Sequence, residues 1–238
     1  MENNLQNQKV IIAGGSSGIG LATAQLLLKQ QATVLVTGRD HRKLEMAKSE
    51  NPGLEVSPTN CGDIHALSDF FKATGKFHHL VITVSGAKGG GLFSTLALSD
   101  LRDGFDAKFW PHLKTIQAAL PWLEQNGSIT IITASSTTSR LPGTSGLAAI
   151  NGALEMMVPI LAKELQPLRI NAVSPGVIDT DWWNFLGQQE KQTTFNQFSK
   201  QIAVGRIGKP EEVAAVIQSV ITNGYINGSV ISCNGGLG

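Results

Sequence analysis

Metal-binding cysteine patterns, an excess of charge and long apolar runs are all missing from this sequence. Its two cysteines, Cys61 and Cys233, lie far apart and fit no metal-binding spacing. His78 and His79 have no third ligand at a recognisable spacing. We therefore expect no metal site, and free cysteines in a reducing, cytoplasmic setting.

Charge and hydrophobicity exclude two further classes of partner. Lysine and arginine total 19 against 18 aspartates and glutamates, and no basic run is long enough to suggest a nucleic-acid surface. No apolar run approaches the roughly 20 residues of a membrane-spanning helix, and the first residues contain no apolar signal core. We expect a soluble protein that binds neither nucleic acid nor membrane.

Tyrosine occurs once, at Tyr225, so the chain has a phenol side chain at one position only. Otherwise the composition is that of a globular domain, because 42% of the 238 residues are hydrophobic and can bury a full core. A chain of this length is typical of one α/β domain. We therefore expect a single domain over residues 1–238.

One stretch near the N-terminus organises the rest of the chain. Residues 10–13 form a short branched run that predicts a buried strand, and apolar residues recur from Ile19 at near-helical spacing. Gly14, Gly18 and Gly20 lie in the turn between them. Backbone N–H groups at such a helix start are unpaired and carry the positive end of the helix dipole, so a pyrophosphate fits there. An ordinary glycine-rich turn without a ligand is the alternative.

Strand and helix patterns then alternate along the chain. Short apolar runs bounded by turn residues predict further strands at 33–37, 54–56, 79–84, 127–133, 169–174 and 229–232. Helical patterns separate these runs. The alternation predicts a doubly wound parallel sheet of about seven strands, with helices on both faces and a ligand crevice at the carboxyl ends of the strands.

Prolines interrupt two of the predicted helices. A long helical pattern runs from Ser99 to Leu120 and contains Pro111. Since an internal proline removes a hydrogen bond and bends a helix, we expect a kink near Lys108. Pro159 interrupts the helix predicted over 147–165, whose apolar residues lie on more than one face, so this helix is expected to be buried or to form an interface.

Residues that follow three of the predicted strands are candidates for binding a nucleotide. Arg39 follows the second strand, where a dinucleotide places its adenosine ribose, and its guanidinium suits a 2′-phosphate. This favours NADP(H) over NAD(H), with a solvated turn cation as the alternative. Asp63 follows the third strand and can accept from an adenine amino group, cap the next helix, or do both. Ser85 and Gly86 begin a glycine-rich loop that permits close passage of a ribose or is a flexible connector.

Several motifs occur together in one order, at 13–20, Asp63, 171–176, Thr180, 205–212 and 228–236. With these motifs the chain resembles the short-chain dehydrogenase/reductase family over nearly its whole length. The resemblance implies a Rossmann-type fold, a nicotinamide dinucleotide, and a homodimer or homotetramer. The residues expected at the cofactor site are Gly14, Ser16, Ser17, Gly18, Ile19, Gly20, Arg39, Asp63, Ser85, Gly86, Pro175, Gly176 and Thr180.

The catalytic residues of that family are not all present. Its members usually carry an Asn, Ser, Tyr and Lys tetrad, in which tyrosine transfers the proton, lysine lowers its pKa and holds the nicotinamide ribose, and serine binds the reacting oxygen. The corresponding positions read Lys108, Ala134, Leu147 and Asn151, with Ser135 at the serine position if the alignment slips by one residue. Leucine cannot transfer a proton. The resemblance therefore implies cofactor binding with a degenerate catalytic site.

An exchange of residue types leads to a hypothesis. Lys108 stands at the asparagine position and Asn151 at the lysine position, so Lys108 is expected to reach the nicotinamide ribose from the neighbouring helix and to pair with Asn151. Unrelated drift at the two positions is the alternative. Tyr225 cannot replace the missing tyrosine, because it lies in the turn before the last predicted strand.

Two functions remain open. The first is an NADP(H)-dependent oxidoreductase acting on a small apolar carbonyl or alcohol, with the proton handled by Ser135, Ser136, Thr137, Lys108 or a bound water. The second is a catalytically silent protein that holds the dinucleotide as a structural or sensing ligand. Trp182 and Trp183 follow Thr180 and either shape an apolar lid over the substrate or serve packing or a subunit contact.

Overall fold

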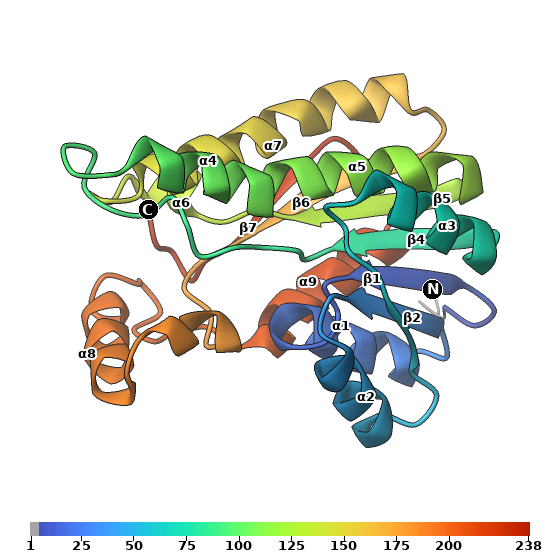
Figure 1. The fold of residues 1–238 in the computed structure, drawn as a ribbon, viewed down its shortest axis with the longest axis horizontal. Helices are drawn as coiled ribbons and strands as arrows, with labels where there is room; N and C mark the ends of the chain where they lie inside the picture. The colour runs from blue at the N-terminus through green and yellow to red at the C-terminus, as the bar shows by residue number, and fades with distance from the viewer. Residues whose placement is uncertain (1–4) are drawn as a thin grey trace.

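Figure 1 shows a computed structural model, which describes residues 5–238 and contains one parallel sheet. Branched apolar residues favour its extended strands, because their side chains pack well on a pleated surface. The strands are β1 (Lys9–Ala13), β2 (Thr33–Gly38), β3 (Glu55–Pro58), β4 (Phe77–Ile82), β5 (Leu123–Ile132), β6 (Arg169–Pro175) and β7 (Val230–Cys233). Their order is β3-β2-β1-β4-β5-β6-β7. The chain first adds β2 and β3 on one side of β1 and then adds β4 to β7 on the other side, so the winding of the sheet switches between β1 and β4. A crevice opens at the carboxyl ends at such a point.

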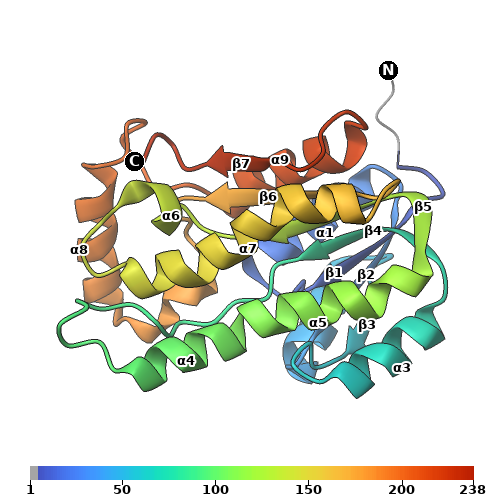
Figure 2. The ribbon, with the colours of Figure 1, turned by 90° about the horizontal axis from the view of Figure 1, so that it is seen from above.

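Helices cover both faces of this sheet (Figures 1 and 2). One face carries α3 (Ile64–Thr74), α5 (Phe109–Ala119) and α7 (Ser145–Glu164), and the other carries α1 (Gly18–Lys29), α2 (His41–Glu50) and α9 (Pro210–Thr222). The remaining helical segments are α4 (Leu98–Ala107), α6 (Ser136–Ser139), α8 (Gln188–Ser199) and the short 3-10 helices η1 (Leu120–Trp122) and η2 (Asp181–Phe185). The predicted doubly wound sheet is confirmed.

Alternation along the strands divides the core into two layers. Ile11 packs with residues of α3, α5 and α7, whereas its neighbour Ile12 packs with residues of α1, α2 and α9. Successive side chains of a strand point to opposite faces, so a strand covered on both sides is apolar at most positions. This explains why the strands read as continuous apolar runs rather than as alternating ones.

The helix expected over 99–120 is broken at Lys108, as the position of Pro111 predicts. α4 ends at Ala107 and α5 begins at Phe109, with Lys108 between them at φ −128° and ψ −61°. Pro111 has no N–H to donate and its ring excludes a regular turn before it. The break directs the Lys108 side chain into the protein, where the residue is 7% exposed.

α7 is longer and more apolar than the sequence patterns suggested. Among residues 5–238 it is the one helix that is long and apolar enough, by composition, to cross a membrane. It continues through Pro159, and Ile150, Leu154 and Val158 on one side of it are buried in the fold. Core helices of globular proteins can have the same composition, and one side of α7 packs beside β6 while Met156 and Ile160 are exposed.

Two histidines are buried in a neutral form. His79 on β4 places Nδ1 2.8 Å from Ser128 Oγ and Nε2 2.6 Å from Gln8 Oε1. Burial, with a smaller effect of the Arg169 charge, lowers the pKa of His79 to about 3. Burial also lowers the pKa of His112 on α5 to about 3. The folded protein therefore keeps both imidazole groups neutral at pH values at which the unfolded chain protonates them.

We predict that the free energy of unfolding decreases as the pH falls from 6.5 toward 5. In this range the unfolded chain binds protons at His79 and His112 while the folded protein does not, so each histidine contributes a loss of up to about 1.4 kcal/mol per pH unit. Urea denaturation at several pH values measures this slope. His79→Gln cannot titrate and should reduce the slope; an unchanged slope would contradict a neutral buried His79.

Candidate functional site

A cleft of about 1030 Å³ opens at the carboxyl ends of the strands. It is lined by the loops that follow β1, β2, β3, β4, β5 and β6, as expected for a doubly wound sheet. The residues of the expected cofactor site that line it are Gly14, Ser16, Ser17, Gly18, Ile19, Gly20, Arg39, Ser85, Gly86, Pro175, Gly176 and Thr180. The structure thus gathers residues from distant parts of the chain around one cavity.

The turn between β1 and α1 is shaped by close backbone contacts. Gly14 has φ +90°, and a Cβ atom on it would lie 2.8 Å from Thr83 Oγ1. A Cβ atom on Gly20 would lie 2.5 Å from the carbonyl oxygen of Gly14. The N-cap residue of α1, Ser17, makes no side-chain cap hydrogen bond. The first N–H groups of this helix consequently face the cleft without a side-chain acceptor, which suits an anion.

At the adenosine end the structure assigns Asp63 one of its two expected roles. Its carboxylate accepts hydrogen bonds from the backbone N–H groups of His65 and Ala66 and so caps α3. Asp63 is exposed and does not line the cleft, whereas Asn60, Cys61 and Gly62 just before it do. The cap bonds lower the pKa of the Asp63 carboxyl group. Both cap bonds go to Oδ1, so the second carboxylate oxygen is not used by the cap, and contact with adenine stays a prediction.

Lys108 is the buried cation of the cleft. Its Nζ donates to the carbonyl oxygen of Thr133 at 3.1 Å, at the end of β5. Burial lowers the pKa of Lys108 to about 8, and the charge of Glu155 opposes this shift. A lysine with this pKa exchanges its proton near neutral pH far more readily than a solvated lysine. Its position therefore suits proton transfer as well as binding.

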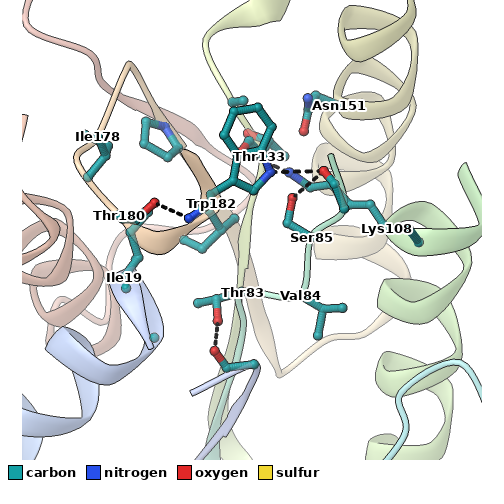
Figure 3. Close-up of a pocket in the computed structure, with 18 of the residues that line it drawn as sticks. Ile19, Thr83, Val84, Ser85, Lys108, Thr133, Asn151, Ile178, Thr180 and Trp182 are labelled. Atoms are coloured by element: carbon teal, nitrogen blue, oxygen red, sulfur yellow. Dashed lines mark hydrogen bonds between the residues drawn. The ribbon is translucent and has the colours of Figure 1, made fainter. Parts of the chain in front are cut away.

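Asn151 lies on α7, across the cleft from the end of β4 (Figure 3). Its Nδ2 donates to Ser136 Oγ at 3.2 Å and to the carbonyl oxygen of Leu147 at 2.9 Å. These bonds fix the orientation of the amide group. Its Oδ1 is buried and has no hydrogen-bond partner. The expected pairing of Lys108 with Asn151 is not formed, because Lys108 Nζ binds Thr133 instead.

The other tetrad positions also line the cleft. Ala134 and Leu147 supply only apolar side chains there. Ser135 is 5% exposed and its N–H donates to the carbonyl oxygen of Pro175 at 2.8 Å, which fixes the chain after β5 beside the chain after β6. Ser135 and Ser136 follow Ala134 directly, and their hydroxyl groups are of a type that can bind a carbonyl oxygen.

Trp182 and Trp183 belong to η2 and both line the cleft. The indole Nε1 of Trp182 donates to the carbonyl oxygen of Gly86 at 3.1 Å and bridges the cleft (Figure 3). Trp183 Nε1 donates to the carbonyl oxygen of Ile178 at 3.0 Å, and its ring meets Phe195 of α8 edge to face. Trp182 thus spans the cleft and Trp183 packs on α8, and a role of the pair as a lid over the substrate stays a prediction.

Sequence reasoning missed Lys43. It lies in the first turn of α2, lines the cleft beside Arg39, and pairs with Asp181 of η2 at 3.8 Å. The signal in the sequence is the basic run from His41 to Lys43 at the start of a predicted helix, where acidic residues are favoured.

Comparison with known proteins places the chain in a family. A model of the enoyl-(acyl carrier protein) reductase family matches residues 13–238. FabG, a 3-oxoacyl-(acyl-carrier-protein) reductase of Thermotoga maritima, is 30% identical over 98% of both chains. The chain belongs to the short-chain dehydrogenase/reductase family. The resemblance inferred from the motifs is confirmed at this level.

Solved structures of other short-chain dehydrogenases/reductases agree with the fold. An NADPH-bound short-chain oxidoreductase from Pseudomonas aeruginosa PAO1, described as containing an atypical catalytic center, gives a TM-score of 0.88. It is 26% identical, and the match covers 99% of this chain and 98% of the other. A small-chain dehydrogenase in complex with NADPH gives a TM-score of 0.84 at 26% identity, over 97% of this chain and 98% of the other.

We predict that Gly20→Ala destroys the cleft of this short-chain dehydrogenase/reductase, whereas Gly152→Ala is tolerated. The added methyl group at position 20 meets the backbone oxygen of Gly14 at 2.5 Å, but at position 152, inside α7, it meets a Thr137 methyl group at 3.8 Å. We expect Gly20→Ala to destabilise by about 1–3 kcal/mol and Gly152→Ala to stabilise by up to about 1 kcal/mol. Thermal unfolding measures both. Equal effects would contradict the close contact at Gly20.

Proposed function

We propose that this protein is an NADP(H)-dependent oxidoreductase in which Lys108 takes over proton transfer from the missing tyrosine. The observation that carries the proposal is the unpaired, buried Oδ1 of Asn151, which lines the same cleft as the buried Lys108. Buried polar atoms in native proteins are almost always hydrogen-bonded, so an unpaired acceptor in a cleft indicates a donor on a ligand. A ribose hydroxyl of a nicotinamide dinucleotide is such a donor.

The rest of the cleft fits the same cofactor. The uncapped start of α1 suits the pyrophosphate, and the absence of side chains at Gly14 and Gly20 lets a ligand approach the backbone. Arg39 and Lys43 lie together at the end of the cleft where the adenosine ribose is expected, and their charges suit a 2′-phosphate. The two NADPH-bound relatives support NADP(H) as the dinucleotide.

Proton transfer is assigned to the chain's own residues. When bound, the nicotinamide supplies a hydride for the carbonyl carbon of a substrate. The carbonyl oxygen then needs a proton, and the ammonium of Lys108 donates it, since burial has lowered its pKa to about 8. The hydroxyl of Ser135 binds the same oxygen while it gains negative charge. The relative with an atypical catalytic center supports cofactor binding by a protein with an unusual site.

The walls of the cleft define the class of substrate. Apolar side chains from α7, η2, α8 and the segment before α7 form part of the cleft wall, namely those of Leu141, Leu147, Ile150, Trp182, Trp183 and Phe198. Such walls exclude water and favour an uncharged, apolar carbonyl or alcohol. We infer a small apolar ketone, aldehyde or alcohol as the substrate.

A silent dinucleotide-binding protein is the second candidate function. It is favoured by Ala134 and Leu147, whose side chains can neither bind an oxyanion nor transfer a proton. In this case the cleft retains the nucleotide as a structural or sensing ligand. The two candidates share the cofactor and differ in whether any substrate is turned over.

We also propose that the protein forms a homodimer or homotetramer. Met156 and Ile160 lie one helical turn apart on α7 and are 72% and 56% exposed. Trp110 on α5, the helix that contacts α7, is 49% exposed. Large apolar side chains gathered on neighbouring helices are typical of subunit contacts.

The cofactor assignment predicts a selective loss on removal of Arg39. Arg39→Ala should weaken NADPH binding about ten- to hundredfold, because a hydrogen bond to a charged group contributes about 1.5–3 kcal/mol. NADH binding should be nearly unchanged. Titration calorimetry with both dinucleotides measures this, and Arg102→Ala, an exposed position on α4, is the control. Equal weakening of both dinucleotides would contradict recognition of the 2′-phosphate by Arg39.

The catalytic assignment predicts a pH profile. Ketone reduction should slow as the pH rises through about 8, because the protonated form of Lys108 is the proton donor. Lys108→Met should lower kcat at least about a hundredfold while NADPH still quenches tryptophan fluorescence. The exposed Lys163→Met is the control. A Lys108→Met variant with normal turnover would contradict the assignment, and a wild-type protein that binds NADPH without any turnover of ketones, aldehydes or alcohols would favour the silent protein.

A further inference from the structure

The five-residue segment Asp181–Phe185 (η2), which we call the lid, is tied to both sides of the cleft. On one side, Asp181 Oδ2 lies 3.8 Å from Lys43 Nζ in the first turn of α2. On the other side, Trp182 Nε1 donates to the carbonyl oxygen of Gly86 in the loop after β4. Figure 3 shows the Trp182 indole between Thr180 on one side and Ser85 and Lys108 on the other. The two contacts hold neighbouring residues of one short segment across the cleft.

The aromatic rings of the lid are packed on each other. Trp182 meets Trp183 and Phe185 edge to face, with ring centroids 4.8 and 5.2 Å away. The N–H of Trp183 donates to the carbonyl oxygen of Thr180, and the N–H of Leu186 donates to that of Trp183. Loss of the Asp181 contact is therefore transmitted directly to the neighbouring Trp182 bridge.

The start of α2 carries charges of the wrong sign for a helix N-terminus. His41, Arg42 and Lys43 occupy its first turn, where the helix dipole favours acidic residues and disfavours cations. Among residues 5–238, Lys43 forms an ion pair there, with Asp181, while Arg39 and Arg42 form none. Such a local conflict with helix preferences is typical of a functional site. The carboxylate of the N-cap residue Asp40 accepts from the Lys43 N–H and offsets part of this conflict, and an anion bound beside Arg39 and Lys43 would offset the rest.

We propose that the 2′-phosphate of NADP(H) releases the lid by taking Lys43 from Asp181. This inference rests on the proposed function, because it requires the adenosine end of NADP(H) to lie at Arg39 and Lys43. A phosphate monoester carries nearly two negative charges at neutral pH, against one on Asp181. The Lys43–Asp181 contact is long and half-exposed, so it is weak and is readily exchanged for the phosphate.

The exchange sets an order of binding. The adenosine end of the cofactor enters beside α2 and frees Asp181 from Lys43. The hydrogen bond from Trp182 to Gly86 is then the remaining one of the two contacts that hold the lid across the cleft. Gly86, Lys108 and Asn151 line the same cavity as Trp182, so breaking this bridge frees the indole from the wall of the cavity that also contains Lys108 and Asn151. NAD(H) has no 2′-phosphate and leaves Lys43 with Asp181. The lid thus distinguishes the two dinucleotides in addition to Arg39.

The test uses adenosine 2′,5′-bisphosphate, which has the 2′-phosphate but no nicotinamide, and adenosine 5′-monophosphate, which lacks the 2′-phosphate. Hydrogen exchange of residues 181–186 is followed by mass spectrometry on the full chain. The bisphosphate should accelerate exchange of the lid about two- to fivefold, the range expected when a half-exposed ion pair is lost. The monophosphate should leave it unchanged. A bisphosphate that binds but slows lid exchange, or leaves it unchanged, overturns the proposal and leaves the cofactor assignment intact.

Two variants separate the ion pair from general effects on the lid. Asp181→Asn should show fast lid exchange without any ligand, no further acceleration by the bisphosphate, and about two- to fivefold tighter binding of the bisphosphate. Asp179→Asn is the matched control, because Asp179 pairs with Lys191 of α8 at 2.8 Å and does not line the cleft. It should respond to the bisphosphate as the wild type does.

Trp182→Phe tests the second contact, since it keeps an aromatic ring but removes the Nε1 donor. This variant should also show faster lid exchange without ligand, and it should bind NADPH and NADH more tightly by similar factors. If Asp181→Asn and Asp179→Asn behave alike, the lid proposal is wrong. If the bisphosphate binds no more tightly than the monophosphate in the wild type, the NADP(H) assignment is wrong and the lid proposal fails with it.

Discussion

The close contact between the β1–α1 turn and the end of β4 is the constraint on which the cleft depends. Thr83 Oγ1 lies 3.1 Å from the carbonyl oxygen of Ala13 and 2.9 Å from that of Gly14, so the strand end rests directly on the turn. A side chain at Gly14 or Gly20 would separate the two. The start of α1 faces the cleft with N–H groups that no side chain caps, and this is where we propose that a pyrophosphate binds.

In the proposed function, nucleotide binding and proton transfer depend mainly on different residues. The glycine-rich turn and the basic residues near Arg39 belong to the first strands and helices, whereas Lys108 lies at the break between α4 and α5 and Asn151 lies on α7. Substitution of the usual tyrosine position by Leu147 therefore leaves the nucleotide site unaffected. The break between α4 and α5 supplies a different ionisable group, because it buries Lys108 at the end of β5.

Features that arise from local physics could be predicted from the sequence, and features that arise from distant contacts could not. The periodicity of apolar residues located the strands, and Pro111 located the helix break at Lys108. The bridge from Trp182 to Gly86 joins residues 96 apart, and no local pattern records it. Asp63 stood after a strand in a position compatible with two roles, and the bonds to its own helix show the capping role.

A crystal structure with NADP⁺ bound tests the central claim most directly, because it shows which side chains surround the nicotinamide ribose. The account predicts Asn151 Oδ1 and Lys108 Nζ within hydrogen-bond distance, about 3.2 Å, of the ribose hydroxyls or of the site next to the reactive carbon. A structure in which NADP⁺ fills the cleft while Lys108 points to solvent and Asn151 Oδ1 stays unpaired would contradict it.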